Sequence, residues 1–241
     1  MTAERSPPPL DARAALFLDF DGTLAPIQND PDTVSLPDGG ADRLLKLSQA
    51  LDGALVAVSG RDIRDLSARL PVDIWRAGGH GLEICAPGEV PLPLPIQAPG
   101  TLLADIEDIV ADFPGTRVES KGPVIAVHYR GAPESEGSLL DALNELVENL
   151  EGYAIQQGKM VLEAKPARAH KGRALEHIMT LDPFLSRVPV MIGDDTTDED
   201  AMASALRAGG LAIKVGAGET VAPYRLADPD AVWAWLGASS L

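Results

Sequence analysis

Residues 14–26 read AALFLDFDGTLAP, and this stretch decides the fold. Its first half is a continuous apolar run, which is typical of a central parallel strand covered on both faces. The run ends in two carboxylates, Asp19 and Asp21, which Gly22 and Thr23 follow. A buried strand that ends in acids predicts a polar site at the carboxyl edge of a sheet, because ligands bind there in open α/β folds.

Similar strand patterns alternate with amphipathic helical patterns on both sides of this segment. Alternation of strands and helices predicts an α/β core with a parallel sheet and right-handed crossovers. The further strands are expected at 53–60 (GALVAVSG), 188–195 (VPVMIGDD) and 211–216 (LAIKVG). The helices are expected at 37–51, 61–70, 171–179, 197–209 and 230–240.

The alternation stops near residue 87. PGEVPLPLPIQAPG (87–100) is too rich in proline for a central strand or a helix and is interpreted as a connector. Helices are then expected at 101–113 and 136–150, and hairpins at 115–131 and 153–166 with turns at Lys121–Gly122 and Gly158–Lys159. This order favours a small mixed or antiparallel sheet with helices on one face. We therefore expect a discontinuous Rossmann-like core, residues 1–86 and 166–241, with an inserted α+β module at 87–165.

Composition narrows the class of protein. A net charge of −16 over 241 residues argues against nucleic acid and anionic membrane surfaces as partners. No apolar run approaches the roughly 20 residues that span a bilayer, and the N-terminus lacks the pattern of a secretory signal. The single cysteine, Cys85, excludes an internal disulfide and suits a reducing compartment. We expect a monomeric cytoplasmic protein that takes a small-molecule substrate.

Four carboxylates at two strand ends are candidate metal ligands: Asp19, Asp21, Asp194 and Asp195. Oxygen donors with room for water and phosphate suit Mg²⁺, and a cation would relieve the repulsion among clustered carboxylates. The alternative is that each pair is a solvated loop or a helix cap, since TDED before AMASAL is a plausible helix N-terminus. Four histidines without ligand spacing argue against a histidine metal site.

The chemistry that these residues suggest is phosphoryl transfer through a carboxylate. Asp19 would attack phosphorus and form an aspartyl-phosphate. Asp21 would give a proton to the leaving oxygen and later take one from the attacking water. Lys171 would offset charge on the phosphoryl oxygens, since a lysine at a helix start is unfavourable unless an anion lies nearby.

A phosphate would also need donors at the end of the second strand. Ser59 ends the strand at 53–60, and its hydroxyl together with Gly60 and Arg61 could hold phosphate oxygens. A structural serine in a turn is the alternative for this position.

The four elements together resemble the haloacid-dehalogenase superfamily of phosphatases. DFDGT (19–23) resembles its first motif, Ser59 its second, Lys171 its third and GDDTTDED (193–200) its fourth. The resemblance implies a Rossmann-like core, Mg²⁺ and a cap domain inserted between the second and third motifs.

A closer resemblance, over nearly the whole chain, is to bacterial trehalose-6-phosphate phosphatases. It rests on DFDGTLAPI, VAVSGRD, AGGHGLE, VESKGPVIAVHYR, QQGKMVLEAKPARAHKG, IGDDTTDEDAM and KVGAGET. It implies hydrolysis of trehalose 6-phosphate as the last step of trehalose biosynthesis, with sugar or phosphate contacts from Glu119, Lys121, Arg130 and Glu163. Gly79, where such enzymes often carry a larger residue before the His-Gly pair, is one departure.

Two alternatives remain open. The core chemistry does not separate trehalose 6-phosphate from another phosphosugar, such as sucrose phosphate or glucosylglycerol phosphate. A non-enzymatic phosphosugar sensor is the less favoured alternative, because Asp19, Asp21, Lys171 and Asp194 are all present.

Overall fold

The computed structural model describes residues 6–93, 97–167 and 169–238. The chain forms two compact units: Met1–Pro91 with His170–Leu241 make unit 1, and Leu92–Ala169 make unit 2. Each unit has its own hydrophobic core. Within the described ranges, no helix has the length and apolar character needed to cross a membrane. Residues 94–96 of the expected connector and the last two of the expected C-terminal helix, 239 and 240, lie outside the described residues.

Unit 1 is built on a seven-stranded sheet in the order β11-β10-β9-β1-β2-β3-β4. All neighbouring strands are parallel except β3 and β4. β1 (Ala14–Leu18) lies in the middle and is buried along its whole length, as expected of an apolar run covered on both faces. The predicted α/β core is confirmed. The other strands are β2 (Leu55–Val58), β3 (Trp75–Gly78), β4 (Glu83–Cys85), β9 (Val188–Gly193), β10 (Leu211–Val215) and β11 (Tyr224–Leu226).

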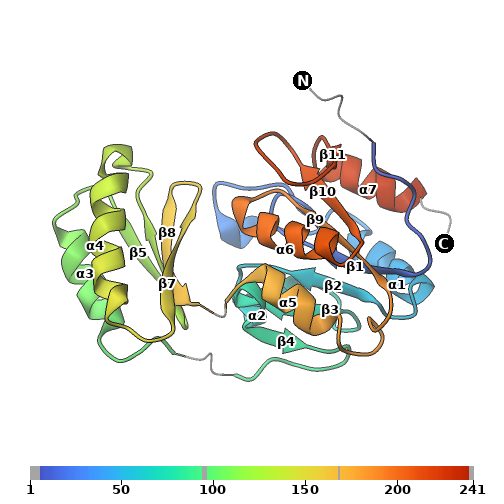
Figure 1. Ribbon diagram of the computed structural model, residues 1–241, viewed down its shortest axis with the longest axis horizontal. Helices are drawn as coiled ribbons and strands as arrows, with labels where there is room; N and C mark the ends of the chain where they lie inside the picture. The colour runs from blue at the N-terminus through green and yellow to red at the C-terminus, as the bar shows by residue number, and fades with distance from the viewer. Residues whose placement is uncertain (1–5, 94–96, 168, 239–241) are drawn as a thin grey trace. The chain divides into compact units, whose positions relative to one another are not determined.

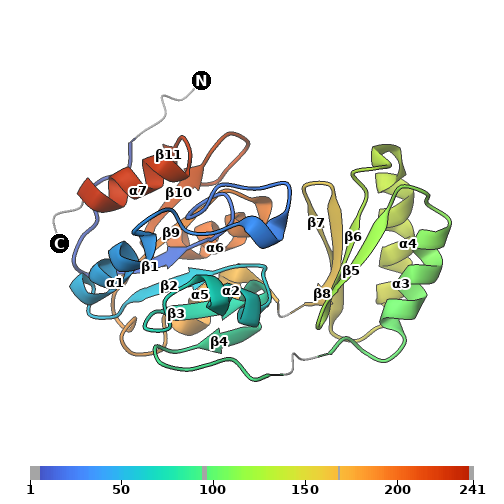
Figure 2. The same ribbon diagram turned by 180° about the vertical axis from the view of Figure 1, so that it is seen from behind.

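Helices cover both faces of this sheet: α5 and α6 lie on one face, and α1 and α2 on the other (Figures 1 and 2). The face that each helix covers follows from the direction in which its connection runs along the sheet. β1 leads through α1 to β2, whereas β9 leads through α6 to β10 in the opposite direction along the sheet. Right-handed crossovers that run in opposite directions place their helices on opposite faces. The carboxyl ends of β1 and β9 therefore meet at a topological switch point, where α/β folds bind ligands. The helices are α1 (Gly40–Ala50), α2 (Ile63–Arg69), α5 (Lys171–Ile178), α6 (Thr196–Arg207) and α7 (Pro229–Ala238).

Three strands of unit 1, namely β3, β4 and β11, were not predicted from the sequence. Each has only three or four residues. Runs this short carry no periodicity that separates a strand from a loop. Their pairing partners, rather than their own pattern, make them strands.

Unit 2 is an antiparallel sheet in the order β5-β6-β8-β7, with both helices on one face (Figure 1). Buried apolar side chains of the two helices, such as Ile106 and Leu143, share a core with Ile125 and Leu162 of the sheet. This arrangement confirms the predicted small sheet with helices on one face, and of the two predicted forms, mixed and antiparallel, it is the antiparallel one. The elements are α3 (Leu102–Ala111), β5 (Arg117–Lys121), β6 (Val124–His128), α4 (Glu136–Glu148), β7 (Tyr153–Gly158) and β8 (Val161–Pro166).

Both predicted hairpins of unit 2 are present, but their turns begin one residue later than predicted. Lys121 pairs with Val124, so the first turn is Gly122–Pro123. Gly158 pairs with Val161, so the second turn is 159–160. Gly122 has φ +67° and Met160 has φ +61°, and left-handed residues of this kind are the ones that reverse a chain in tight turns.

Candidate active site

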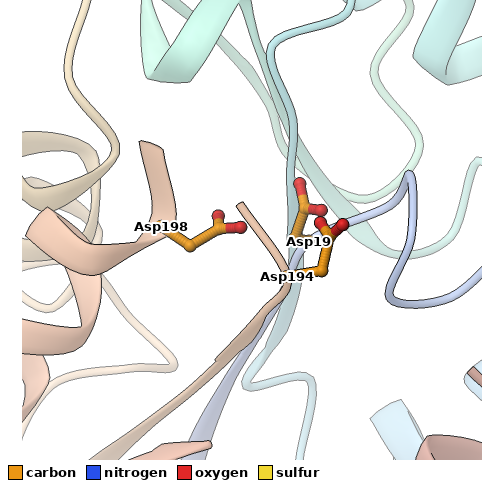
Figure 3. A group of neighbouring side chains, drawn as sticks. All are labelled: Asp19, Asp194 and Asp198. Atoms are coloured by element: carbon orange, nitrogen blue, oxygen red, sulfur yellow. The ribbon is translucent and has the colours of Figure 1, made fainter. Parts of the chain in front are cut away.

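Three aspartates converge at the switch point of unit 1. Asp19 follows β1, Asp194 follows β9, and Asp198 lies in the first turn of α6. One carboxylate oxygen from each lies within 4.8 Å of the others. Figure 3 shows that the carboxylate of Asp198 points from its helix toward the other two. The strand ends that the sequence singled out are therefore brought together with a third acid from the following helix.

Lys171 lies among these acids. It is the first residue of α5, and its Nζ donates to Oδ1 of Asp19 and to Oδ1 of Asp198, both at 2.6 Å. The lysine side chain is 2% exposed and the two carboxylates are 5% and 0% exposed. A lysine at a helix N-terminus is expected to have an anion nearby, and Lys171 has two, the carboxylates of Asp19 and Asp198.

Burial dominates the electrostatics of the cluster. Burial, together with repulsion from Asp198, raises the pKa of Asp19 well above its usual range, although Lys171 opposes the shift. Burial and repulsion from Asp198 and Asp195 raise the pKa of Asp194 to about 6. Burial alone would lower the pKa of Lys171, but attraction to Asp19 and Asp198 raises it. One ammonium therefore faces more carboxylate charge than it can neutralise.

The donor set fits a hard divalent cation. Two buried carboxylates and one partly buried one converge beside Lys171, and Nζ of a second lysine, Lys214, donates to the backbone oxygen of Asp194. The pKa values of Asp19 and Asp194 stay raised despite these lysines, and an added cation would relieve the repulsion that contributes to both shifts. Oxygen-only donors are those that Mg²⁺ prefers. The backbone also approaches closely here: a Cβ on Gly22, whose φ is +78°, would meet Oδ2 of Asp194 at 2.2 Å. Only glycine leaves room for that carboxylate.

Asp198 was not among the metal ligands predicted from the sequence. It lies at the third position of α6, in a capping box with Asp195, and its Oδ2 accepts from the backbone N–H of Asp195 at 3.0 Å. An acidic residue at the third helical position is a sequence signal for a capping box. The contact of Asp198 with Lys171, in contrast, depends on the tertiary fold. Asp195 is the N-cap itself, and its Oδ1 accepts from the backbone N–H of Thr196 at 2.7 Å. The capping geometry considered as an alternative for this segment is therefore observed at Asp195.

Ser59, Gly60 and Arg61 form a tight turn at the end of β2. The Ser59 hydroxyl oxygen accepts from the backbone N–H of Arg61 at 3.1 Å, and its backbone oxygen accepts from the N–H of His80 at 2.9 Å. A Cβ on Gly60 would come within 2.7 Å of the His80 ring. The turn thus belongs to the carboxyl edge that carries Asp19 and Asp194, because β2 and β9 are the two neighbours of β1.

Asp21 is paired with an arginine. The Nε of Arg61 donates to Oδ2 of Asp21 at 2.7 Å, and its Nη2 donates to Oδ1 at 2.6 Å. The same guanidinium donates to Asp65 at 2.7 Å and to the backbone oxygen of Pro31 at 2.9 Å. Burial would lower the pKa of Arg61, but its bonds to Asp21 and Asp65 raise it. The acid and the arginine that sequence reasoning assigned to two different tasks are thus bonded to each other.

Three of the four candidate residues of unit 2 lie on the sheet face opposite the helices. Ala126 of the middle strand β6 pairs with Glu119 of β5 on one side and with Glu163 of β8 on the other. Nζ of Lys121 lies 3.9 Å from a carboxylate oxygen of Glu119 and 3.7 Å from one of Glu163. Arg130 lies beyond the end of β6 and is exposed, and it takes part in no hydrogen bond or ion pair within the described part of the chain. Three of the four predicted residues therefore form one group, and the fourth is separate from it.

Comparison with known proteins agrees with this arrangement. Residues 17–230 match the trehalose-phosphatase family. The chain is 40% identical to the trehalose-6-phosphate phosphatase of Escherichia coli (strain K12), over 95% of this chain and 87% of that protein.

Solved structures show the same fold. The crystal structure of a trehalose-6-phosphate phosphatase related protein matches with a TM-score of 0.71 and 28% identity, covering 92% of this chain and 95% of that one. The C-terminal domain of C. albicans trehalose-6-phosphate phosphatase matches with a TM-score of 0.80 at 22% identity, covering 98% of each chain. The chain belongs to the trehalose-phosphatase family of phosphoric monoester hydrolases.

Proposed function

We propose that this chain hydrolyses trehalose 6-phosphate to trehalose and inorganic phosphate, with Mg²⁺ as its metal. The observation that carries the proposal is the buried ammonium of Lys171, bonded at 2.6 Å to both Asp19 and Asp198. A positive charge fixed beside a strand-end carboxylate suits an anionic phosphoryl group. The family and the 40% identical relative supply the substrate.

In the proposed reaction Asp19 is the nucleophile and Asp21 is the acid and base. An oxygen of Asp19 attacks phosphorus, the bond between phosphorus and the sugar oxygen breaks, and Asp21 gives that oxygen a proton. Water then attacks the aspartyl-phosphate and gives a proton to Asp21, and the bond between phosphorus and Asp19 breaks. Asp21 is a third exposed, so solvent can reach it, but donating its proton requires one of its bonds with Arg61 to open.

The metal part of the proposal rests on the carboxylate cluster. Asp19, Asp194 and Asp198 would hold the ion, and the sequence assigns Asp21 and Asp195 to the same site. When bound, Mg²⁺ supplies a fixed positive charge for the phosphoryl oxygens.

The protein's own donors complete the proposed phosphate site. Lys171 adds its charge beside Asp19, and Ser59 and Gly60 would donate to phosphate oxygens.

Recognition of the sugar is assigned to unit 2. Carboxylates accept hydrogen bonds from vicinal hydroxyls, so Glu119 and Glu163 suit the sugar, while Lys121 and Arg130 suit hydroxyl or phosphate oxygens. In this proposal unit 2 is the cap that selects the substrate. The same proposal places the chain in the cytoplasm, because a single cysteine suits a reducing compartment, and takes the chain to be a monomer.

A phosphate-release screen with and without Mg²⁺ tests the proposal. The panel contains trehalose 6-phosphate, sucrose phosphate, glucosylglycerol phosphate, glucose 6-phosphate and p-nitrophenyl phosphate. We expect the highest kcat/KM for trehalose 6-phosphate and loss of release when EDTA removes the metal. A higher kcat/KM for another phosphosugar would replace the substrate and leave the chemistry in place. Tight binding without phosphate release would favour the sensor.

A further inference from the structure

His128, which was not among the residues predicted from the sequence to bind the substrate, lies beside one of the proposed sugar-binding carboxylates. Its Nε2 lies 2.7 Å from Oε2 of Glu119. His128 is the last residue of β6, whose register pairs it with Arg117 and pairs Glu119 with Ala126. His128 and Glu119 are therefore diagonal neighbours on the sheet face opposite the helices, a spacing that long side chains can bridge.

Three basic side chains lie near the carboxylate and make unequal contacts with it. His128 makes the only hydrogen bond that Glu119 accepts through its side chain within the described part of the chain, whereas Nη2 of Arg117 and Nζ of Lys121 lie 3.7 and 3.9 Å from the same Oε2. The Arg117 side chain is 68% exposed, so solvent screens its contribution. Lys121 is shared with Glu163 at 3.7 Å. His128 is thus the neighbour that fixes where Oε2 lies.

The bond also decides which atom of the carboxylate is left for a ligand. The hydrogen bond from His128 lowers the pKa of Glu119, with support from Lys121, so the glutamate is a carboxylate and can only accept. Nε2 of His128 must then be the donor, whether or not the ring is charged. With Oε2 held by the histidine, Oε1 remains as the acceptor for a hydroxyl.

We propose that His128 is a positioning residue for sugar recognition: it holds Oε2 of Glu119 and leaves Oε1 for a hydroxyl of the substrate. This inference rests on the proposed function of Glu119. A fixed carboxylate binds a hydroxyl better than a mobile one because its side-chain freedom is already lost before the ligand arrives.

Two substitutions of His128 test the inference, one that removes the hydrogen-bond donor and one that keeps it. His128→Leu removes the donor, and His128→Gln keeps an N–H at a similar reach. We expect His128→Leu to raise KM for trehalose 6-phosphate about tenfold, and His128→Gln to stay within about threefold of the wild type. Turnover of p-nitrophenyl phosphate, which has no sugar, should change less than about twofold in both variants and also reports that they fold. Arg117→Leu is the matched control, since it removes an exposed cation near the same oxygen, and it should leave both substrates within about twofold.

Glu119→Ala and the double variant with His128→Leu complete the design. If His128 acts through Glu119, its loss adds nothing to Glu119→Ala. An unchanged KM in His128→Leu, failure of His128→Gln to rescue, or equal losses on the aryl phosphate would each overturn the positioning role. If Glu119→Ala raises KM and His128→Leu does not, only the role of His128 is lost. If Glu119→Ala itself leaves KM unchanged, the sugar site proposed for unit 2 is lost and the role of His128 with it.

Discussion

The two charged clusters of this protein use the same residue types in opposite surroundings. In unit 1 the side chains of Lys171 and Asp19 are 2% and 5% exposed. In unit 2 the side chains of Lys121 and Glu119 are 28% and 35% exposed, and their charged atoms lie 3.9 Å apart rather than 2.6 Å. Both contacts are lysine–carboxylate ion pairs, yet only the first is shielded from solvent.

The difference separates two kinds of task. A buried charge interacts strongly and cannot be compensated by water, so removing one partner has a large effect. A half-exposed pair is screened and can exchange its partner for water or for a hydroxyl at small cost. The buried cluster therefore suits a reaction in which charge develops at fixed positions, and the half-exposed cluster suits recognition of a polar ligand.

The largest expected effect on activity comes from a substitution in the buried cluster that leaves the cluster of unit 2 unchanged. Asp19→Asn removes the proposed nucleophile, so phosphate release from trehalose 6-phosphate and from p-nitrophenyl phosphate should fall together, by about a thousandfold or more. The fold should persist, because a neutral amide removes one of the carboxylates that repel each other. Activity assays and a urea unfolding curve measure both quantities. Asp11→Asn, an exposed acid paired with Arg13, is the control, and substantial residual turnover by Asp19→Asn would refute the nucleophile.

A pH titration of stability sharpens the contrast, since burial raises the pKa of Asp194 to about 6 from an ordinary 3.8. A carboxyl whose pKa rises on folding stabilises the folded state while it is protonated. That contribution is present below pH 3.8 and is lost as the pH rises through 6. Metal-free wild type should therefore lose roughly 2 kcal/mol relative to Asp194→Asn between pH 4 and pH 7.

Urea unfolding of both proteins in EDTA at several pH values measures this difference. Added Mg²⁺ should stabilise the wild type more at pH 7 than at pH 4, because the cation prefers the ionised carboxylate. Parallel pH profiles of the two proteins without metal would contradict the raised pKa.

The half-exposed cluster should respond on the sugar substrate only. Glu119→Ala and Glu163→Ala should each lower kcat/KM for trehalose 6-phosphate by about 10- to 100-fold, since each removes a charged hydrogen-bond acceptor. The aryl phosphate should be nearly unaffected, because it offers no sugar hydroxyls. Glu134→Ala, a change outside the sheet in the same unit, is the control. Equal losses on both substrates would remove the two glutamates from sugar recognition.

In unit 1, the acids at the strand ends could be predicted from the sequence, whereas the side chains that contact them from other elements could not. The acids after β1 and β9 could be found because each closes an apolar run, and parallel strands bring their carboxyl ends to one edge. Asp198 could not, because its local pattern is that of a helix cap and its contact with Lys171 spans 27 residues. The bond between Arg61 and Asp21 spans 40 residues and has no local signal at all.

Unit 2 was predicted at the level of its elements and less well at the level of its contacts. Alternation located both hairpins, while the backbone conformation of Gly122 and Met160 moved each turn by one residue. Facing side chains such as His128 and Glu119 depend on that register. A shift of one residue would place one of them on the opposite face.

The smallest expected effect lies at the edge of the buried cluster, where the sequence left two roles open for Asp195, metal ligand and helix cap. The cap geometry predicts that Asp195→Ala costs about 1 kcal/mol of unfolding free energy and that Asp195→Ser, which keeps a capping oxygen, recovers most of it. In both variants the Mg²⁺ concentration that gives half-maximal activity should stay within about twofold of the wild type, since a cap does not hold the ion. A ligand would behave differently, because serine restores the cap without restoring the carboxylate. If both variants need about tenfold more Mg²⁺, Asp195 binds the metal and the capping bond seen here is secondary.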